Sequence, residues 1–184
     1  MTSDFPDSLK LRAAHRYCGK QSSWYWGWVA IDTSDSTAVG IVTAMRFDTP
    51  VPGVRLPYAS VNIVYARRYP GLGVGLLVHA RDELGRSAPD PITLYRTGES
   101  TSKGKAACDA ADLPLDPVRQ HLLDAGKSTP LPPYKEEVAT YWGRRHLKTA
   151  SDWFCVDAIA AKAEEVDLLN RLPPGFPYSS EPSE

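Results

Sequence analysis

One short segment gathers glycines and an arginine, Arg68-Tyr69-Pro70-Gly71-Leu72-Gly73-Val74-Gly75. Residues 58–65 before it favour a strand because they are rich in β-branched and aromatic types. The residues after it, to Leu84, carry apolar side chains at helical spacing. A helix N-terminus exposes unpaired N–H groups at the positive end of its dipole and so attracts phosphate. Glycine lets a phosphate approach closely, and the Arg68 guanidinium can add charge-assisted hydrogen bonds. The spacing therefore predicts a phosphate-binding loop, with a plain tight turn as the alternative.

Two common phosphate-loop patterns do not fit this chain. The dinucleotide fingerprint needs Gly-x-Gly-x-x-Gly within repeated βαβ units, whereas these glycines are spaced Gly71-x-Gly73-x-Gly75. The nucleotide-triphosphate loop needs four residues between its first glycine and Gly-Lys-Ser/Thr. The segment 98–106 is one residue too long and ends in Ala106, which lacks the metal-binding hydroxyl.

A third pattern does fit. Arg68-x-x-Gly71-x-Gly73, placed between a fourth strand and an amphipathic helix, resembles the acyl-CoA pyrophosphate loop of the GNAT superfamily of N-acetyltransferases. Residues 62–66 then match the strand whose backbone pairs with the pantetheine arm, and residues 92–95 match the strand that splays away from it. Residues 101–113 look like the next helix of that family, so the resemblance covers roughly residues 38–113.

The resemblance implies direct acyl transfer from acetyl-CoA, the default donor, to an amine on a small molecule or a protein. It implies no metal, and it places Cys108 where the family often has a tyrosine acid. It also implies that one set of residues contacts the coenzyme: Ile63, Val64, Arg68, Gly71, Leu72, Gly73, Val74 and Gly75. A base must free the attacking amine, because an ordinary lysine pKa of ~10.4 leaves little neutral amine at pH 7. His15, His79 and Glu99 are the titrating candidates, and the residues do not select among them.

Composition limits the partners and the compartment. The chain has 184 residues with 21 basic and 22 acidic side chains, so its formal charge of −1 argues against bulk nucleic acid as the partner. Its three cysteines form no Cys-x-x-Cys pair, which fits reduced thiols in the cytoplasm better than disulfides or a zinc site. The sequence shows no apolar run near 18 residues and no signal-peptide pattern, so we expect neither a membrane span nor conventional secretion.

The elements that position these residues predict an α/β (α+β) fold, a mixed and mostly antiparallel sheet with flanking helices and a helical C-terminal third. Strands are expected at 9–18, 24–31, 38–47, 58–65 and 92–95, and helices at 74–84, 105–111, 117–125, 134–142 and from Ser151. We predict three regions: a GNAT-like core at 1–128, a helical extension at 129–172 packed on that core, and a mobile tail at 173–184.

Two other functions stay open. Ser60 and Asn62 stand where the family often has a glutamate base, so the chain could be a catalytically inactive GNAT-like binding or regulatory module, and a homodimer is possible. Residues 141–148 mix bases with aromatics, which is typical of nucleic-acid surfaces, although a solvated helix end explains them as well. Trp24, Trp26 and Trp28 fall on one strand face, and we expect a packed core layer there in preference to an exposed platform.

Overall fold

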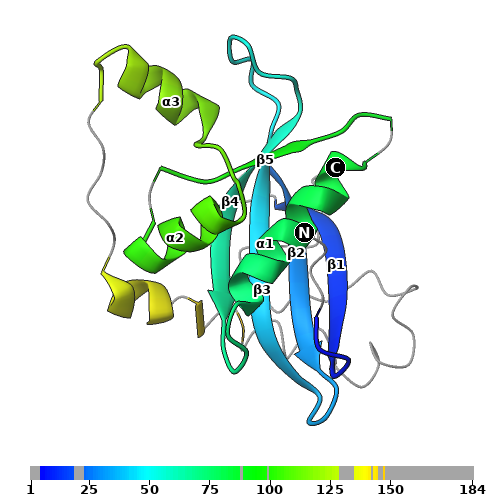
Figure 1. Cartoon of the computed structure of the whole chain (residues 1–184). Helices are drawn as coiled ribbons and strands as arrows, with labels where there is room; N and C mark the ends of the chain where they lie inside the picture. Colours follow the sequence, from blue (N-terminus) through cyan, green and yellow to red (C-terminus); the bar gives the residue numbers. More distant parts are fainter. Residues whose placement is uncertain are drawn as a thin grey trace.

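A computed structural model describes residues 5–18, 23–87, 89–98, 100–128, 135–141, 143–144 and 147. Four antiparallel strands form a meander, and a fifth strand joins β4 in parallel, giving the order β1-β2-β3-β4-β5 (Figure 1). The strands are β1 (Leu9–Cys18), β2 (Ser23–Asp32), β3 (Thr37–Phe47), β4 (Tyr58–Ala66) and β5 (Thr93–Tyr95). The predicted mixed, mostly antiparallel sheet with flanking helices is confirmed.

Helix α1 (Leu72–Gly85) makes the crossover from β4 to β5 and covers one face of the sheet (Figure 1). Parallel strands require such a crossover, because a tight turn cannot join them. Leu76, Leu77 and Ala80 are fully buried and belong to the same core as Trp28 and Val42 of the strands. The apolar periodicity of this segment therefore gives the helix its position above the sheet.

Two shorter helices follow β5, α2 (Ser102–Ala110) and α3 (Pro117–Asp124). Thr101 caps α2 by accepting the Gly104 N–H at 2.9 Å, and Asp116 caps α3 by accepting the Val118 N–H at 3.1 Å. Residues 136–141 are also helical. The helix predicted from Ser151 and the tail at 173–184 lie outside the described residues, so the helical C-terminal third and the three-region division stay predictions.

A β-bulge interrupts the pairing of β3 with β4. Thr43 lies opposite Ile63 while the next residue, Ala44, lies opposite Val61, so Asn62 is the extra residue. A bulge bends its strand and re-aims the side chains that follow. Val64 and Ala66 consequently point to the α1 side, where they are the nearest side chains to Gly73.

Among the helices of the described residues, we find none with the length and apolar character needed to cross a bilayer.

Candidate functional site

Strands β4 and β5 part soon after they meet. Tyr58, Ala59 and Ser60 pair with Thr93, Leu94 and Tyr95, and there the ladder ends. The next residue, Arg96, turns to an isolated parallel bridge with Leu115. Within the described part of the chain, β4 therefore has no partner on this edge from Val61 to Ala66. We call this separation of the two strands beyond the Ser60–Tyr95 pair the V-shaped opening; β4 runs from there toward the loop that precedes α1.

The N-terminus of α1 follows β4 in the chain, at the end of the strand away from the Ser60–Tyr95 pair. Gly71 is the N-cap residue with φ 79°, a left-handed conformation that favours glycine, and a Cβ there would meet nothing within 4 Å. The Leu72 N–H is taken by the Tyr69 carbonyl at 3.2 Å. Among the described residues, no acceptor receives the N–H of Gly73 or Val74. These two amides remain available to an anion beside the end of β4.

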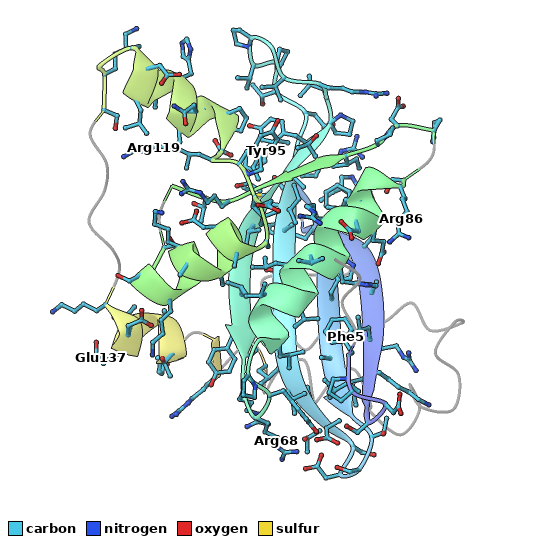
Figure 2. The ribbon with its side chains drawn as sticks, in the orientation of Figure 1. Phe5, Arg68, Arg86, Tyr95, Arg119 and Glu137 are labelled. Atoms are coloured by element: carbon cyan, nitrogen blue, oxygen red, sulfur yellow. The ribbon has the colours of Figure 1, made fainter. Side chains whose placement is uncertain are left out.

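Gly75, in contrast, has a packing role. A Cβ at this position would lie 3.0 Å from Cε1 of Phe5, and the Gly75 N–H already donates to the Gly71 carbonyl at 2.9 Å. Figure 2 shows Phe5 on the β1 side of α1. The structure thus brings Gly71, Leu72, Gly73 and Val74 together at the helix start and places Gly75 under an aromatic ring.

Arg68 lies in the loop before α1, and its side chain pairs with carboxylates. It adopts φ 70°, and its Nη1 lies 2.5 Å from Oδ2 of Asp35 and 3.3 Å from Oδ2 of Asp32. Figure 2 shows it at the end of the molecule where β2 turns into β3. The hydrogen bond from Arg68 also helps to lower the pKa of Asp35, after the larger effect of Thr37. The predicted phosphate ligand is thus engaged by two carboxylates.

The two predicted strand contacts lie on opposite sides of β4. Val64 faces α1, with its Cγ2 3.6 Å from the position of a Cβ on Gly73. Ile63 is half-buried and points the other way, because side chains alternate along a strand. The bulged Asn62 places its Nδ2 3.5 Å from the Thr43 hydroxyl.

Cys108 lies on α2 and is buried, with 4% of its surface exposed. Burial raises the pKa of its thiol to about 11. Proton transfer from such a thiol to an ordinary thiolate, with a pKa of ~8.5, is uphill. The acid role that the resemblance assigns to Cys108 stays a prediction.

The candidate bases do not gather at the opening. His15 on β1 stacks on Trp26 with ring centroids 4.6 Å apart, and burial lowers its pKa, as does the nearby Arg46. His79 on α1 pairs with Glu83 at 3.2 Å, and the same carboxylate oxygen accepts the Trp28 Nε1–H at 3.0 Å. His15 lies on the far side of the sheet, because β1 and β2 are at the opposite end from β4 and β5. His79 faces the same end, beside Phe5 and the Glu83 that accepts from Trp28 of β2. Glu99 lies outside the described residues.

The row of tryptophans on β2 is only partly a core layer. Trp28 is fully buried, Trp26 is half-buried and Trp24 is 41% exposed. The expected packed core layer is therefore present at Trp28. At the other end of the row, the aromatic surface also includes His15.

Helical residues that the sequence did not connect to the site reach it from the C-terminal side. Glu136 accepts the Lys103 N–H at the start of α2 at 3.2 Å, and Gly143 lies against the Tyr65 ring of β4. Leu147 is buried. Of the basic and aromatic patch at 141–148, Trp142, Arg145, His146 and Lys148 lie outside the described residues. The sequence signal for this contact was the glycine at position 143, and a glycine alone does not indicate which residue packs against it.

Comparisons with family models, with curated proteins and with solved structures found no match. Among the described residues, no three His, Cys, Asp or Glu side chains gather as metal ligands would.

Proposed function

We propose that this protein is an acyl-CoA-dependent N-acyltransferase of the GNAT kind, using acetyl-CoA as donor and an amine as acceptor. The observation that carries the proposal is the parting of β4 from β5 after the Ser60–Tyr95 pair. An unpaired strand edge offers N–H and C=O groups to any extended ligand that carries amides. The pantetheine arm of coenzyme A is such a ligand.

The dimensions and polarity of the opening suit this coenzyme. From Val61 to Ala66 the free edge is roughly 17 Å long at the usual rise of a strand. It runs toward the Gly73 and Val74 amides, which would receive the pyrophosphate at the positive end of α1. One ligand can thus hold its phosphates at the helix and its thioester near the closed end of the V.

The proposed reaction is a direct transfer. The amine nitrogen attacks the thioester carbonyl, the C–N bond forms, the C–S bond breaks, and the coenzyme leaves as a thiolate that takes up a proton. Backbone N–H groups of β4 would polarise the carbonyl, and most of the acceleration would come from positioning. The acceptor is a small-molecule or protein amine, no metal takes part, and the proposed compartment is the cytoplasm.

One set of observations favours a second candidate, a module of the same architecture that binds the coenzyme without turnover. In the described part of the chain, His15 and His79 lie away from the opening, and Cys108 is a weakened acid. Such a module would bind CoA yet release no thiol from acetyl-CoA.

Titration calorimetry with acetyl-CoA tests the binding, and thiol release with a panel of amines tests the turnover. Gly73→Glu should abolish binding because it places a carboxylate at the proposed pyrophosphate position. Gly85→Glu is the matched control, since it puts the same side chain at the other end of α1, where a Cβ meets nothing within 4 Å. No binding at ~1 mM acetyl-CoA, or equal binding by the two variants, would overturn the proposal. Binding without thiol release would favour the inactive module.

A further inference from the structure

Asp32, the last residue of β2, holds the loop that begins α1. Its side chain is 4% exposed, and it is the one buried carboxylate among the described residues. Oδ1 accepts the Ser34 N–H at 3.0 Å and the Ser34 hydroxyl at 2.6 Å. Oδ2 accepts the Tyr69 hydroxyl at 2.6 Å and the Arg68 Nη1–H at 3.3 Å. A buried charge persists only with such compensation, so these donors explain how Asp32 stays ionised.

The hydrogen bonds join segments that are distant in sequence. Tyr69 and Arg68 belong to the loop between β4 and α1, whereas Ser34 belongs to the turn between β2 and β3. Ser8, the residue before β1, joins the same cluster, because its carbonyl accepts the Thr33 N–H at 2.8 Å and its Oγ lies 3.5 Å from the Tyr69 hydroxyl. Asp32 therefore ties the loop before α1 to the end of β2 and the β2–β3 turn.

The loop needs this tether because its backbone is strained. Arg68 has φ 70°, a left-handed conformation that is unfavourable for a residue with a Cβ. Such residues persist when the surrounding contacts over-determine them, and they concentrate at functional sites. Here the carboxylates of Asp32 and Asp35 hold the Arg68 side chain.

Tyr69 connects Asp32 directly to the first turn of α1. Its hydroxyl is fixed by Asp32 and its carbonyl accepts the Leu72 N–H at 3.2 Å. The Gly73 and Val74 amides follow in the same turn. We propose that Asp32 is a positioning residue that aims these two amides at an anion, with Arg68 acting as its tether and not as a phosphate ligand. The inference rests on the proposed function for the identity of the anion.

The charge state agrees with this role. Hydrogen bonds, first from the Ser34 side chain and then from Tyr69, lower the pKa of Asp32 to about 2. The carboxylate is therefore ionised throughout the physiological range, and the tether does not depend on pH there.

Asp32→Asn tests the inference, with Asp48→Asn as the matched control because Asp48 is 61% exposed and pairs with Arg46. Without any ligand, amide hydrogen exchange should be about tenfold faster in Asp32→Asn than in the control at Leu72 and Gly75, whose N–H groups are hydrogen-bonded at the start of α1. Unchanged exchange would overturn the proposal. If Asp32→Asn fails to fold, Tyr69→Phe removes one of the same hydrogen bonds and is judged by the same result.

Coenzyme affinity then separates positioning from simple electrostatics. Removing a negative charge near a phosphate site should tighten CoA binding if charge alone matters. Positioning predicts the opposite, a loss of about tenfold. Tighter binding by Asp32→Asn would therefore overturn the inference. If wild-type protein binds no CoA, the proposed function fails, and the exchange experiment alone decides whether Asp32 orders the loop.

The tether role of Arg68 is tested by combining variants. If Asp32 and Arg68 act through one loop conformation, Arg68→Gln and Asp32→Asn should each weaken CoA binding about equally, and the double variant should be no weaker than the worse single variant. Losses that multiply in the double variant would show that Arg68 contacts the phosphate independently.

Discussion

Gly143 of the C-terminal helical residues lies so close to Tyr65 of β4 that a Cβ on it would fall 2.8 Å from the Tyr65 Cβ and into contact with the ring. Glu136 of the same segment meets Lys103 at the start of α2. Glu136 therefore contacts the start of α2, and Gly143 contacts β4.

Gly143→Ala should push this segment away from β4, because backbone and ring atoms cannot yield as a flexible side-chain end can. Overpacking of this kind costs about 1–3 kcal/mol, which urea unfolding can measure. Gly85→Ala is the control, since its Cβ meets nothing within 4 Å. Tyr65→Ala in the Gly143→Ala background should recover part of the loss, and equal stability of the two single glycine variants would contradict the contact.

Gly40 on β3 has the same kind of role beneath α1. A Cβ there would lie 2.8 Å from Cδ1 of Leu76 and 3.0 Å from Cδ2 of Leu72. Gly40→Ala should therefore force the buried Leu72 and Leu76 side chains to repack and lower the free energy of unfolding by about 1–3 kcal/mol. The matched strand control is Gly27→Ala on β2, where a Cβ meets nothing within 4 Å. Chemical denaturation of both variants checks this. If Gly40→Ala leaves the free energy of unfolding unchanged, the close contact between β3 and α1 is contradicted.

The reactivity of Cys108 tests whether its side of α2 is buried. Because burial raises its thiol pKa from an ordinary value of 9.0 to about 11, the thiolate fraction near pH 8 is about 100-fold smaller than in the unfolded chain. Alkylation by iodoacetamide should be slower by at least that factor in native protein than in guanidinium chloride. Peptide mass spectrometry resolves Cys108 from the other cysteines, and rapid native labelling would show that the site is open.

Local patterns were sufficient to predict the elements, and contacts between distant residues were not. The alternation of apolar residues and the Pro and Gly breaks predicted β1 at 9–18 and the helix after Gly71, because both signals lie within one segment. The bond between Arg68 and Asp32 joins residues 36 positions apart, and it depends on how the β2–β3 turn meets the loop before α1. The motif therefore identified Arg68 as a phosphate ligand, although the fold gives it two carboxylates.

Burial along one strand face was equally hard to foresee. Trp24 and Trp28 are both tryptophans on the same face of β2. Trp28 is buried and donates a hydrogen bond to Glu83 of α1, whereas Trp24 is exposed. Spacing in the sequence gives the face, and only the placement of α1 decides which part of that face is core.

The acid stability of the protein should depend on Asp32. Its folded pKa of about 2 lies below the ordinary value of 3.8, so the unfolded chain takes up a proton first as the pH falls. The stabilisation it contributes is complete above about pH 4 and is lost as the pH falls toward 2. Urea midpoints of wild type and Asp32→Asn should therefore differ most at neutral pH and converge between about pH 4 and pH 2, since the variant has no proton to gain at this position. A difference that stays constant across this range would show that the charge of Asp32, and with it the ionic part of the tether to Arg68, contributes nothing to the folded state.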